Sequence, residues 1–155
     1  MTLQKTYEVQ RGDFCISTDK TRLDIEVIYH FLASESYWSK DIPFHVVRKA
    51  VSNSLCFGVF KGDEQVGFAR VVSDCVTFAW LADVFILKEY RGIGLSKWML
   101  DVIMSHPDLQ ILRRWMLATR DAHELYSRYG FKPIAHPERL MENHLPDVFE
   151  DALVD

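Results

Sequence analysis

The stretch FILKEYRGIGLSKWML, residues 85–100, decides the fold. An apolar run enters a turn that contains Gly92 and Gly94, and an amphipathic helix is predicted to follow. The apolar positions of that helix are Leu95, Trp98, Met99, Val102 and Ile103. Glycine lets a ligand approach the main chain closely, and the first turn of a helix presents unpaired N–H groups with partial positive charge. The turn is therefore a candidate site for an anion such as phosphate.

Two common phosphate-binding motifs do not fit this turn. A P-loop has four residues between its first glycine and Gly-Lys, whereas a single residue separates Gly92 from Gly94, and Ser96 precedes Lys97. The dinucleotide fingerprint has a third glycine where this chain has Lys97. Neither ATP nor NAD is supported. A plain structural interpretation, in which the glycines only permit a tight turn, stays open.

Upstream of the turn, the sequence predicts a hairpin, two helices and three strands. The hairpin has apolar pairs on either side of residues 11–13, and the first helix follows a capping pair formed by Thr21 and Asp24. The second helix begins near Pro43 and keeps its apolar residues at helical spacing. Three β-rich runs then cover residues 55–60, 66–72 and 76–87. Their short polar connections predict an antiparallel meander.

Downstream of the turn, the sequence predicts a strand at residues 115–118, a helix at residues 121–129 that stops at Gly130, and a last strand at residues 131–134. A helical pair, a meander and a βαβαβ unit in this order favour an α/β (mixed α+β) fold. We expect a central mixed sheet in which an antiparallel meander precedes a parallel strand pair, with helices on both faces.

The composition favours one soluble globular domain over residues 1–155. The chain has a mass of 18.1 kDa with 48% hydrophobic and 26% charged residues, so it can bury a core. A formal net charge of -4 argues against a nucleic-acid partner. The longest apolar stretch, residues 76–87, is interrupted by Asp83 and is shorter than the ~20 residues of a membrane span, so we expect no membrane partner.

Cysteines and histidines argue against a disulfide framework and a metal site. Cys15, Cys56 and Cys75 have no CxxC spacing, which favours reduced thiols, and the first residues lack the apolar segment of a secretory signal. We therefore expect a cytoplasmic protein. No histidine pair has metal-ligand spacing, so we expect no metal cofactor. Residues 136–155 carry six acidic side chains and one arginine, as in a solvated tail or an interaction segment.

Two motifs in this chain resemble those of the GNAT superfamily of acyl-CoA-dependent N-acetyltransferases. The first is the motif Arg/Gln-x-x-Gly-x-Gly/Ala, matched by residues 91–96 except that Ser96 stands at the last place. The second is the motif Ala-x-x-Leu-Tyr-x-x-x-Gly-Phe, matched by residues 122–131. Thr119 occupies the place where many members have an asparagine that contacts the pantetheine arm. The resemblance extends over residues 23–134.

The resemblance implies that acetyl-CoA binds as the acyl donor in a cleft between two parallel strands that splay apart. Main-chain groups of Val84, Phe85 and Ile86 would form one side of this cleft, and residues 115–118 the other. The pyrophosphate would lie on the turn after the strand. The residues of that turn are Arg91, Gly92, Ile93, Gly94, Leu95, Ser96 and Lys97.

Acyl transfer to an amine requires that the amine lose a proton and that the departing thiolate gain one. The resemblance implies that Tyr126 is the general acid, although its apolar helix face is also that of a core aromatic. Asp83 is the candidate base, because a carboxylate interrupts an apolar strand beside the expected thioester. A buried structural acceptor, a group that binds a cationic amine, and a water chain as the base are the alternatives.

Tyr37 and Trp38 lie in the predicted loop between the first two helices, which determines acceptor specificity in the superfamily that the chain resembles. They are candidates to contact the amine, or else they anchor the loop to the core. We expect an N-acetyltransferase that moves an acetyl group to a small-molecule or peptide amine in a ternary complex. An inactive CoA-binding regulatory module and an interaction protein built on the acidic tail are the alternatives. A homodimer is compatible with the resemblance.

Overall fold

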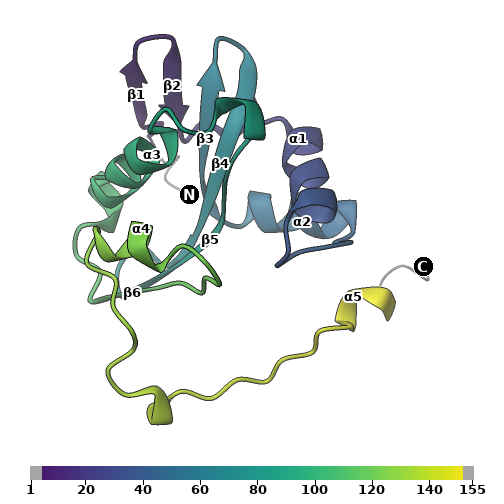
Figure 1. Cartoon of the computed structure of the whole chain (residues 1–155), viewed down its shortest axis with the longest axis vertical. Helices are drawn as coiled ribbons and strands as arrows, with labels where there is room; N and C mark the ends of the chain where they lie inside the picture. Colours follow the sequence, from purple (N-terminus) through teal and green to yellow (C-terminus); the bar gives the residue numbers. More distant parts are fainter. Residues whose placement is uncertain (1–4, 152–155) are drawn as a thin grey trace.

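The computed structural model describes residues 5–151, which form a mixed sheet with helices on both faces (Figure 1). The strands are β1 (Glu8–Arg11), β2 (Phe14–Ser17), β3 (Leu55–Lys61), β4 (Glu64–Ser73), β5 (Phe78–Ile86) and β6 (Arg114–Met116). The helices are α1 (Ile25–His30), α2 (Phe44–Ser52), α3 (Leu95–Met104), α4 (His123–Ser127) and α5 (Val148–Asp151). Strands β1 to β5 pair antiparallel in chain order, and β6 pairs parallel with β5. The predicted fold class is confirmed.

The N-terminal hairpin and both N-terminal helices form where the sequence predicts them. The cap of the first helix differs from the prediction, because Asp24 itself accepts the N–H groups of Glu26 and Val27 at 3.1 and 3.3 Å. Thr21 belongs to a separate turn that Asp19 caps. A carboxylate at the N-cap satisfies two N–H groups that the helix leaves unpaired.

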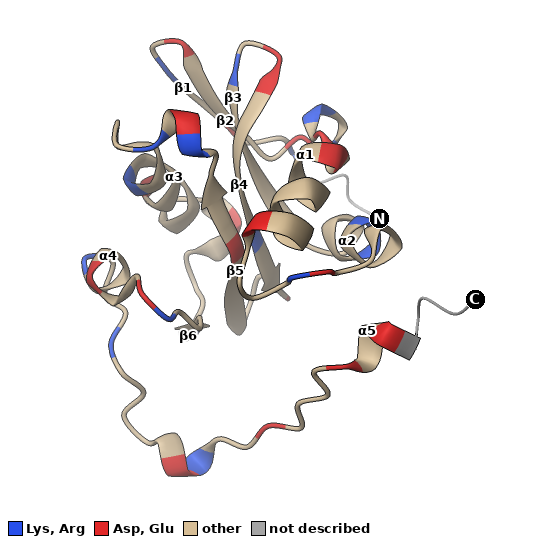
Figure 2. Cartoon of the chain, turned by 45° about the vertical axis from the view of Figure 1, so that its right-hand side comes forward, with Lys and Arg blue, Asp and Glu red and all other residues tan. Residues whose placement is uncertain are grey.

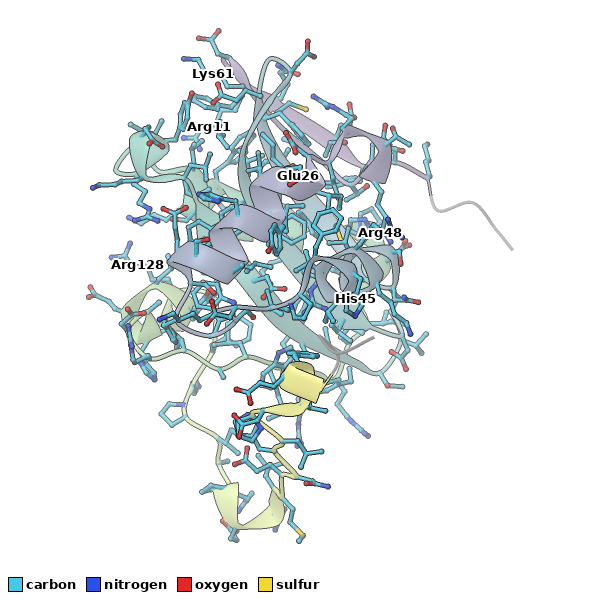
Figure 3. The ribbon with its side chains drawn as sticks, turned by 90° about the vertical axis from the view of Figure 1, so that its right-hand side faces the viewer. Arg11, Glu26, His45, Arg48, Lys61 and Arg128 are labelled. Atoms are coloured by element: carbon cyan, nitrogen blue, oxygen red, sulfur yellow. The ribbon has the colours of Figure 1, made fainter. Side chains whose placement is uncertain are left out.

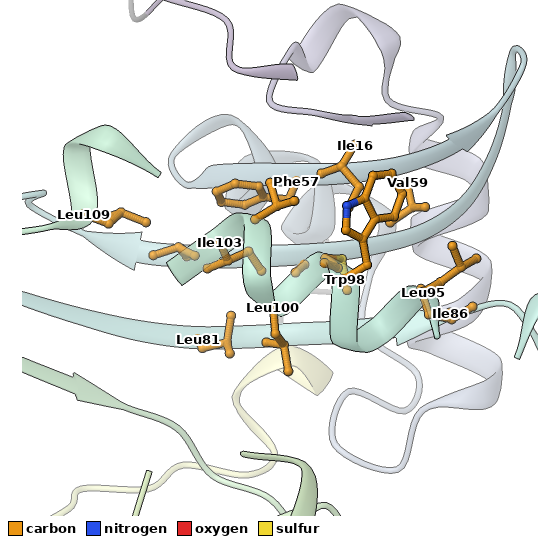
Figure 4. Close-up of a cluster of buried hydrophobic side chains, with 14 of the residues drawn as sticks. Ile16, Phe57, Val59, Leu81, Ile86, Leu95, Trp98, Leu100, Ile103 and Leu109 are labelled. Carbon is orange, nitrogen blue, oxygen red and sulfur yellow. The ribbon is translucent and has the colours of Figure 1, made fainter. Parts of the chain in front are cut away.

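Each face of the sheet has its own apolar cluster. The larger cluster joins α3 to β3, β4 and β5, and its centre includes Phe57, Met99 and Leu100, all fully buried (Figure 4). The smaller cluster joins α1 and α2 to the opposite face through Phe68 and Phe85. The helical stripe that the sequence predicts after the glycine turn therefore faces the sheet.

The parallel pair β5 and β6 is short. Hydrogen-bonded register runs only from Phe78 and Arg114 to Trp80 and Met116, after which the two strands part. Beyond Trp80, β5 pairs with β4 alone, so main-chain polar groups on its other edge face the gap. The splayed strand pair of the predicted fold is present.

The predicted strand at residues 131–134 is wrong, because this segment is irregular in the structure. Pro133 has no N–H to contribute to a ladder, and the neighbouring strand β6 is itself only three residues long. Residues 132–150 form a C-terminal arm that is exposed throughout and curves away from the sheet (Figure 1). The last residues of the predicted acidic tail, 152–155, lie outside the described residues.

Candidate functional site

A cavity of about 410 Å³ lies where β5 and β6 part. The residues that line it include Tyr37, Trp38, Asp83, Val84 and Tyr126, which the sequence analysis singled out. They come from the loop between α1 and α2, from β5 and from α4, so three distant parts of the chain meet here. The sequence analysis assigned a role only to the main chain of Phe85 and Ile86. The side chain of Phe85 lies in the smaller apolar cluster and that of Ile86 in the larger one.

A β-bulge in β5 determines where Asp83 points. Phe68 of β4 faces Phe85 and Arg70 faces Ala82, so Asp83 and Val84 together oppose a single residue of β4. Asp83 has a φ of +55°, in the left-handed region that aspartate enters more readily than most residues. A bulge of this kind re-aims side chains beside functional sites.

Two neighbours hold the Asp83 carboxylate. Arg70 Nε donates to Oδ2 at 2.7 Å, and the indole Nε1 of Trp38 donates to Oδ1 at 2.9 Å. The side chains of Arg70 and Asp83 are only 19% and 9% exposed, and Arg70 also donates to Ser54 Oγ at 3.1 Å. The charge that interrupts the apolar strand is therefore paired, and its direction is set by two bonds.

Tyr126 on α4 is 9% exposed and faces the cavity from the side opposite Asp83's strand. Its ring packs edge-on against Phe131 at 6.0 Å between centroids. Burial raises the pKa of Tyr126 to about 12, with further contributions from Tyr37 and Asp121. The phenol therefore keeps its proton at neutral pH and is able to donate it.

The mouth of the cavity is spanned by a contact that the sequence did not predict. The main-chain N–H of Arg120 donates to the Tyr37 hydroxyl at 3.0 Å, and the Arg120 guanidinium lies 3.9 Å from the centre of the Tyr37 ring. Trp38 packs edge-on against Tyr37 at 5.0 Å. Thr119, found in place of the asparagine that many family members have, accepts the N–H of Ala122 through Oγ1 at 3.0 Å and supports the start of α4.

The glycine turn lies at the end of β5. Gly92 and Gly94 have φ values of +82° and +86°, and a Cβ at either position would meet no atom within 4 Å. Left-handed backbone, rather than lack of room, is therefore what requires glycine here. Residues 91–94 are exposed, and Leu95 begins α3, whose first N–H groups have no partner within the helix.

Side chains around the turn fix its position. Arg91 Nε donates to the main-chain oxygen of Ile86 at 2.8 Å, which ties the turn to the end of its own strand. The hydroxyl of Tyr129 donates to the main-chain oxygen of Lys97 at 2.7 Å, which connects α3 to the segment after α4. The turn and the cavity are thus attached to the same strand and to the same pair of helices.

Sequence reasoning missed the roles of three residues, two that line the cavity and one that holds Asp83 beside it. Arg70 lies on the neighbouring strand at nearly the same distance from the hairpin turn as Asp83, which was a usable signal for their ion pair. Arg120 and Asp121 line the cavity from the loop before α4, and no motif marked them. Residues 5–151 contain no cluster of three metal-ligand side chains and no helix long and apolar enough to cross a membrane.

The chain is similar to proteins of one acetyltransferase family. The model of the acetyltransferase (GNAT) domain matches residues 52–133. A Gibberella zeae protein whose name assigns it to the acetyltransferases is 33% identical over 150 residues, which cover 83% of this chain and 84% of that protein. A crystal structure from Xanthomonas campestris pv. campestris, described as belonging to the GNAT family, is 52% identical and has a TM-score of 0.85. That match covers 88% of this chain and 96% of the other.

Two solved structures of the same fold contain a coenzyme. A Mycobacterium tuberculosis protein in complex with CoA is 18% identical with a TM-score of 0.62, over 90% of this chain and 81% of that one. A GNAT family acetyltransferase of Elizabethkingia anophelis with acetyl-CoA bound is 11% identical with a TM-score of 0.59, over 94% of this chain and 88% of that one. At these identities the likeness shows the fold alone.

Proposed function

The chain belongs to the GNAT acetyltransferase family, and from this we propose that it moves an acetyl group from acetyl-CoA to a primary amine by direct attack in a ternary complex. The observation that carries the proposal is the meeting of Tyr126 and Asp83 in one cavity beside the edge of β5. An acid and a carboxylate on either side of a polar strand edge can supply the proton donor and the proton acceptor that aminolysis of a thioester uses.

The residues at the glycine turn fit a diphosphate. Its main chain is exposed, the left-handed glycines direct the strand into α3, and nothing occupies the space above Gly92 and Gly94. Partial positive charge at the start of α3 and the cations Arg91 and Lys97 favour an anion there. The two coenzyme-containing structures of the same fold support acetyl-CoA as this ligand.

Tyr126 would supply the proton that the departing thiolate needs. Because burial raises its pKa to about 12, the phenol is protonated at physiological pH, and it would hydrogen-bond to the thiolate and pass it a proton as negative charge develops on the sulfur. A covalent route through cysteine has less support, since no described cysteine lines the cavity and burial raises the pKa of Cys56 to about 11.

The free thiols of all three cysteines agree with a cytoplasmic setting.

Asp83 would act on the amine. Each of its oxygens accepts one hydrogen bond from the protein and retains a lone pair, so the carboxylate has the capacity to hold an ammonium group or take its proton. The aromatic side chains of Tyr37, Trp38 and Trp80 provide an apolar wall next to it. We therefore favour a small amine with an apolar or aromatic body as the acceptor.

Release of free CoA thiol from acetyl-CoA, measured on mixing with a panel of amines, tests this function. The panel contains arylalkylamines, aliphatic monoamines, a polyamine and amino acids, and amine-dependent release with at least one of them is the expected result. Asp83→Asn separates the two roles of the carboxylate. Loss of the acidic limb of the pH–rate profile identifies a base, whereas an unchanged profile with a raised KM for the amine identifies a binding group. Asp63→Asn, in the exposed turn between β3 and β4, is the matched control.

A CoA-binding module without turnover is the second candidate. It is favoured by the pairing of Asp83 with Arg70 and Trp38, which gives the carboxylate a structural task of its own. Saturable binding of CoA with no thiol release for any amine in the panel would support this module and contradict the enzyme. An absence of CoA binding would contradict both and favour an interaction protein.

A further inference from the structure

A second cavity, of about 260 Å³, lies between β6 and the C-terminal arm, residues 132–150. All three residues of β6 line it, and the arm contributes five residues from Ile134 to Leu140. These two arm residues are exposed, whereas Trp115 and Met116 of β6 are half-buried. Apolar side chains that stay exposed at the wall of a cavity are available to contact a ligand. The cavity is therefore a candidate binding site besides the one already described.

Two guanidinium groups of this cavity have no acidic partner among the described residues. Arg114 lies on β6 and Arg139 on the arm, and neither belongs to an ion pair within the described part of the chain. Glu138, next to Arg139, has its Oε1 3.2 Å from Nδ1 of His136. In Figure 2 a basic and an acidic position stand side by side on the short helical turn of the arm, Pro137–Arg139, below β6. Guanidinium groups without a partner favour a carboxylate, which accepts two parallel hydrogen bonds from one guanidinium.

Strand register places Arg114 and Met116 on the sheet face that α1 and α2 cover. Arg114 lies opposite Phe78, and Met116 lies opposite Trp80. Trp115, between them, packs against the cluster under α3. Because successive side chains of a strand point to opposite faces, Arg114 and Met116 face away from α3. The cationic wall of the second cavity is thus on the same side of the sheet as the loop between α1 and α2.

Trp80 connects the two cavities. It lines the cavity that holds Asp83, and its register partner Met116 lines the second one. Leu117, the residue after Met116, lines the first cavity again. In Figure 3, which is seen from the side of α1 and α2, the arm lies below α2, the helix that carries Arg48. An extended ligand on this face of the sheet would pass from one cavity to the other.

We propose that the acceptor is a short peptide whose N-terminal amine reaches Asp83 and whose C-terminal carboxylate binds Arg114 and Arg139. This inference rests on the proposed function and names its substrate class. Along β5, Asp83 lies five residues beyond the partner of Arg114, a distance of about 16 Å at roughly 3.3 Å per residue. An extended peptide covers that span with about four or five residues. Its apolar side chains pack on Trp80 and Met116, between its two charged ends.

Thiol release from acetyl-CoA, measured with an apolar dipeptide, tetrapeptide and pentapeptide, tests the inference. Each peptide is used with a free C-terminal carboxylate and as its C-terminal amide, which has nearly the same shape but no charge. The carboxylate form of the two longer peptides should have a kcat/KM about tenfold above that of the amide. The dipeptide is too short to reach both charged groups and should show no such preference. Equal values for the two forms at every length overturn the inference.

Arg114→Gln and Arg139→Gln locate the carboxylate. Either substitution removes charged hydrogen bonds, so the ratio of kcat/KM between the carboxylate and amide forms should fall several-fold. Both side chains are at the surface, so the fold is expected to survive. Arg113→Gln, next to Arg114 but outside the lining of the cavity, is the matched control and should keep the wild-type ratio. A ratio that survives both substitutions in the cavity overturns the assignment of the carboxylate.

Binding separates a failure of this inference from a failure of the proposed function. Calorimetric titration with the N-acetylated forms of the same peptides, which are not acceptors, measures the preference for a carboxylate without turnover. Carboxylate-dependent binding with no thiol release for any amine would contradict the enzyme and support the second cavity as a peptide site. Thiol release from simple amines, with no carboxylate preference in either assay, would contradict this inference alone. The absence of both thiol release and carboxylate preference would contradict both.

Discussion

The bulge in β5 and the glycine turn that follows β5 form their sites in different ways. At the bulge, Asp83 is almost fully buried and is held by Arg70 and Trp38, so the site depends on side chains fixed by other side chains. At the glycine turn, residues 91–94 are exposed and the main chain itself is what faces a ligand. A side-chain site on β5 and a main-chain site in the turn after it therefore lie close together in the chain, and the two sites should respond differently to mutation.

Tyr126→Phe is expected to have the largest effect. It removes the proton donor and leaves the ring packed against Phe131, so turnover should fall about 10²-fold or more while CoA affinity is retained. Steady-state rates and CoA titration measure the two quantities. Tyr29→Phe, on α1 against Phe44, is the matched control and should keep wild-type turnover. A fully active Tyr126→Phe variant would make Tyr126 a packing residue.

Gly94→Ala should weaken CoA binding about tenfold. A left-handed alanine costs roughly 1–2 kcal/mol, and the variant relieves this cost by moving the N–H groups of the turn. Gly62→Ala, with a φ of +59° in the turn between β3 and β4, has the same strain at a distance and should bind CoA normally. Arg91→Ala should cost less than Gly94→Ala if the main chain is the binding group. The reverse order in a CoA titration would shift the binding role to the side chain.

Trp38→Phe should have a smaller effect, on the amine side only. The ring is retained but the 2.9 Å hydrogen bond to Asp83 is lost, which costs about 0.5–1.5 kcal/mol. We expect a several-fold lower kcat/KM for the amine and an unchanged affinity for CoA. Trp80→Phe lines the same cavity without that hydrogen bond and serves as the control. Equal losses in both variants would show that ring size, and not the orientation of Asp83, is what matters.

The pH dependence should show the smallest effect of all. The raised pKa of Tyr126, about 12, keeps the phenol protonated well above the ordinary tyrosine value of about 10. The pH–rate profiles of the wild type and of Tyr126→Phe, each corrected for spontaneous thioester hydrolysis, should therefore have the same shape near pH 10, with no alkaline decline in the wild type alone. Such a decline would mean that the phenol ionises in the ordinary range and is not desolvated as the structure has it.

Sequence reasoning succeeded where local pattern determines the structure. The apolar stripe of α3, the short turns of the meander and the glycines at left-handed positions are each specified by residues close together in the chain. Tyr126, Asp83, Tyr37 and Trp38 were singled out from motifs or from an interrupted pattern, and the structure brings all four to one cavity.

Sequence reasoning failed where the local structure depends on contacts between distant segments. The bulge that turns Asp83 toward Trp38 arises from the register with β4, and no residue of β5 encodes it alone. The contact between Arg120 and Tyr37 uses a main-chain N–H, which leaves no signal in the sequence. Residues 131–134 have the composition of a strand, but a strand forms only when a neighbour pairs with it, and Pro133 weakens that pairing.

The left-handed backbone at Asp83 also limits which residues evolution or an engineer can place there. Glutamate would keep the charge but would enter that conformation at a penalty, whereas asparagine and glycine would keep the conformation and lose the charge. Of these three substitutions none preserves both, so a change at this position trades the negative charge against the backbone conformation that aims it.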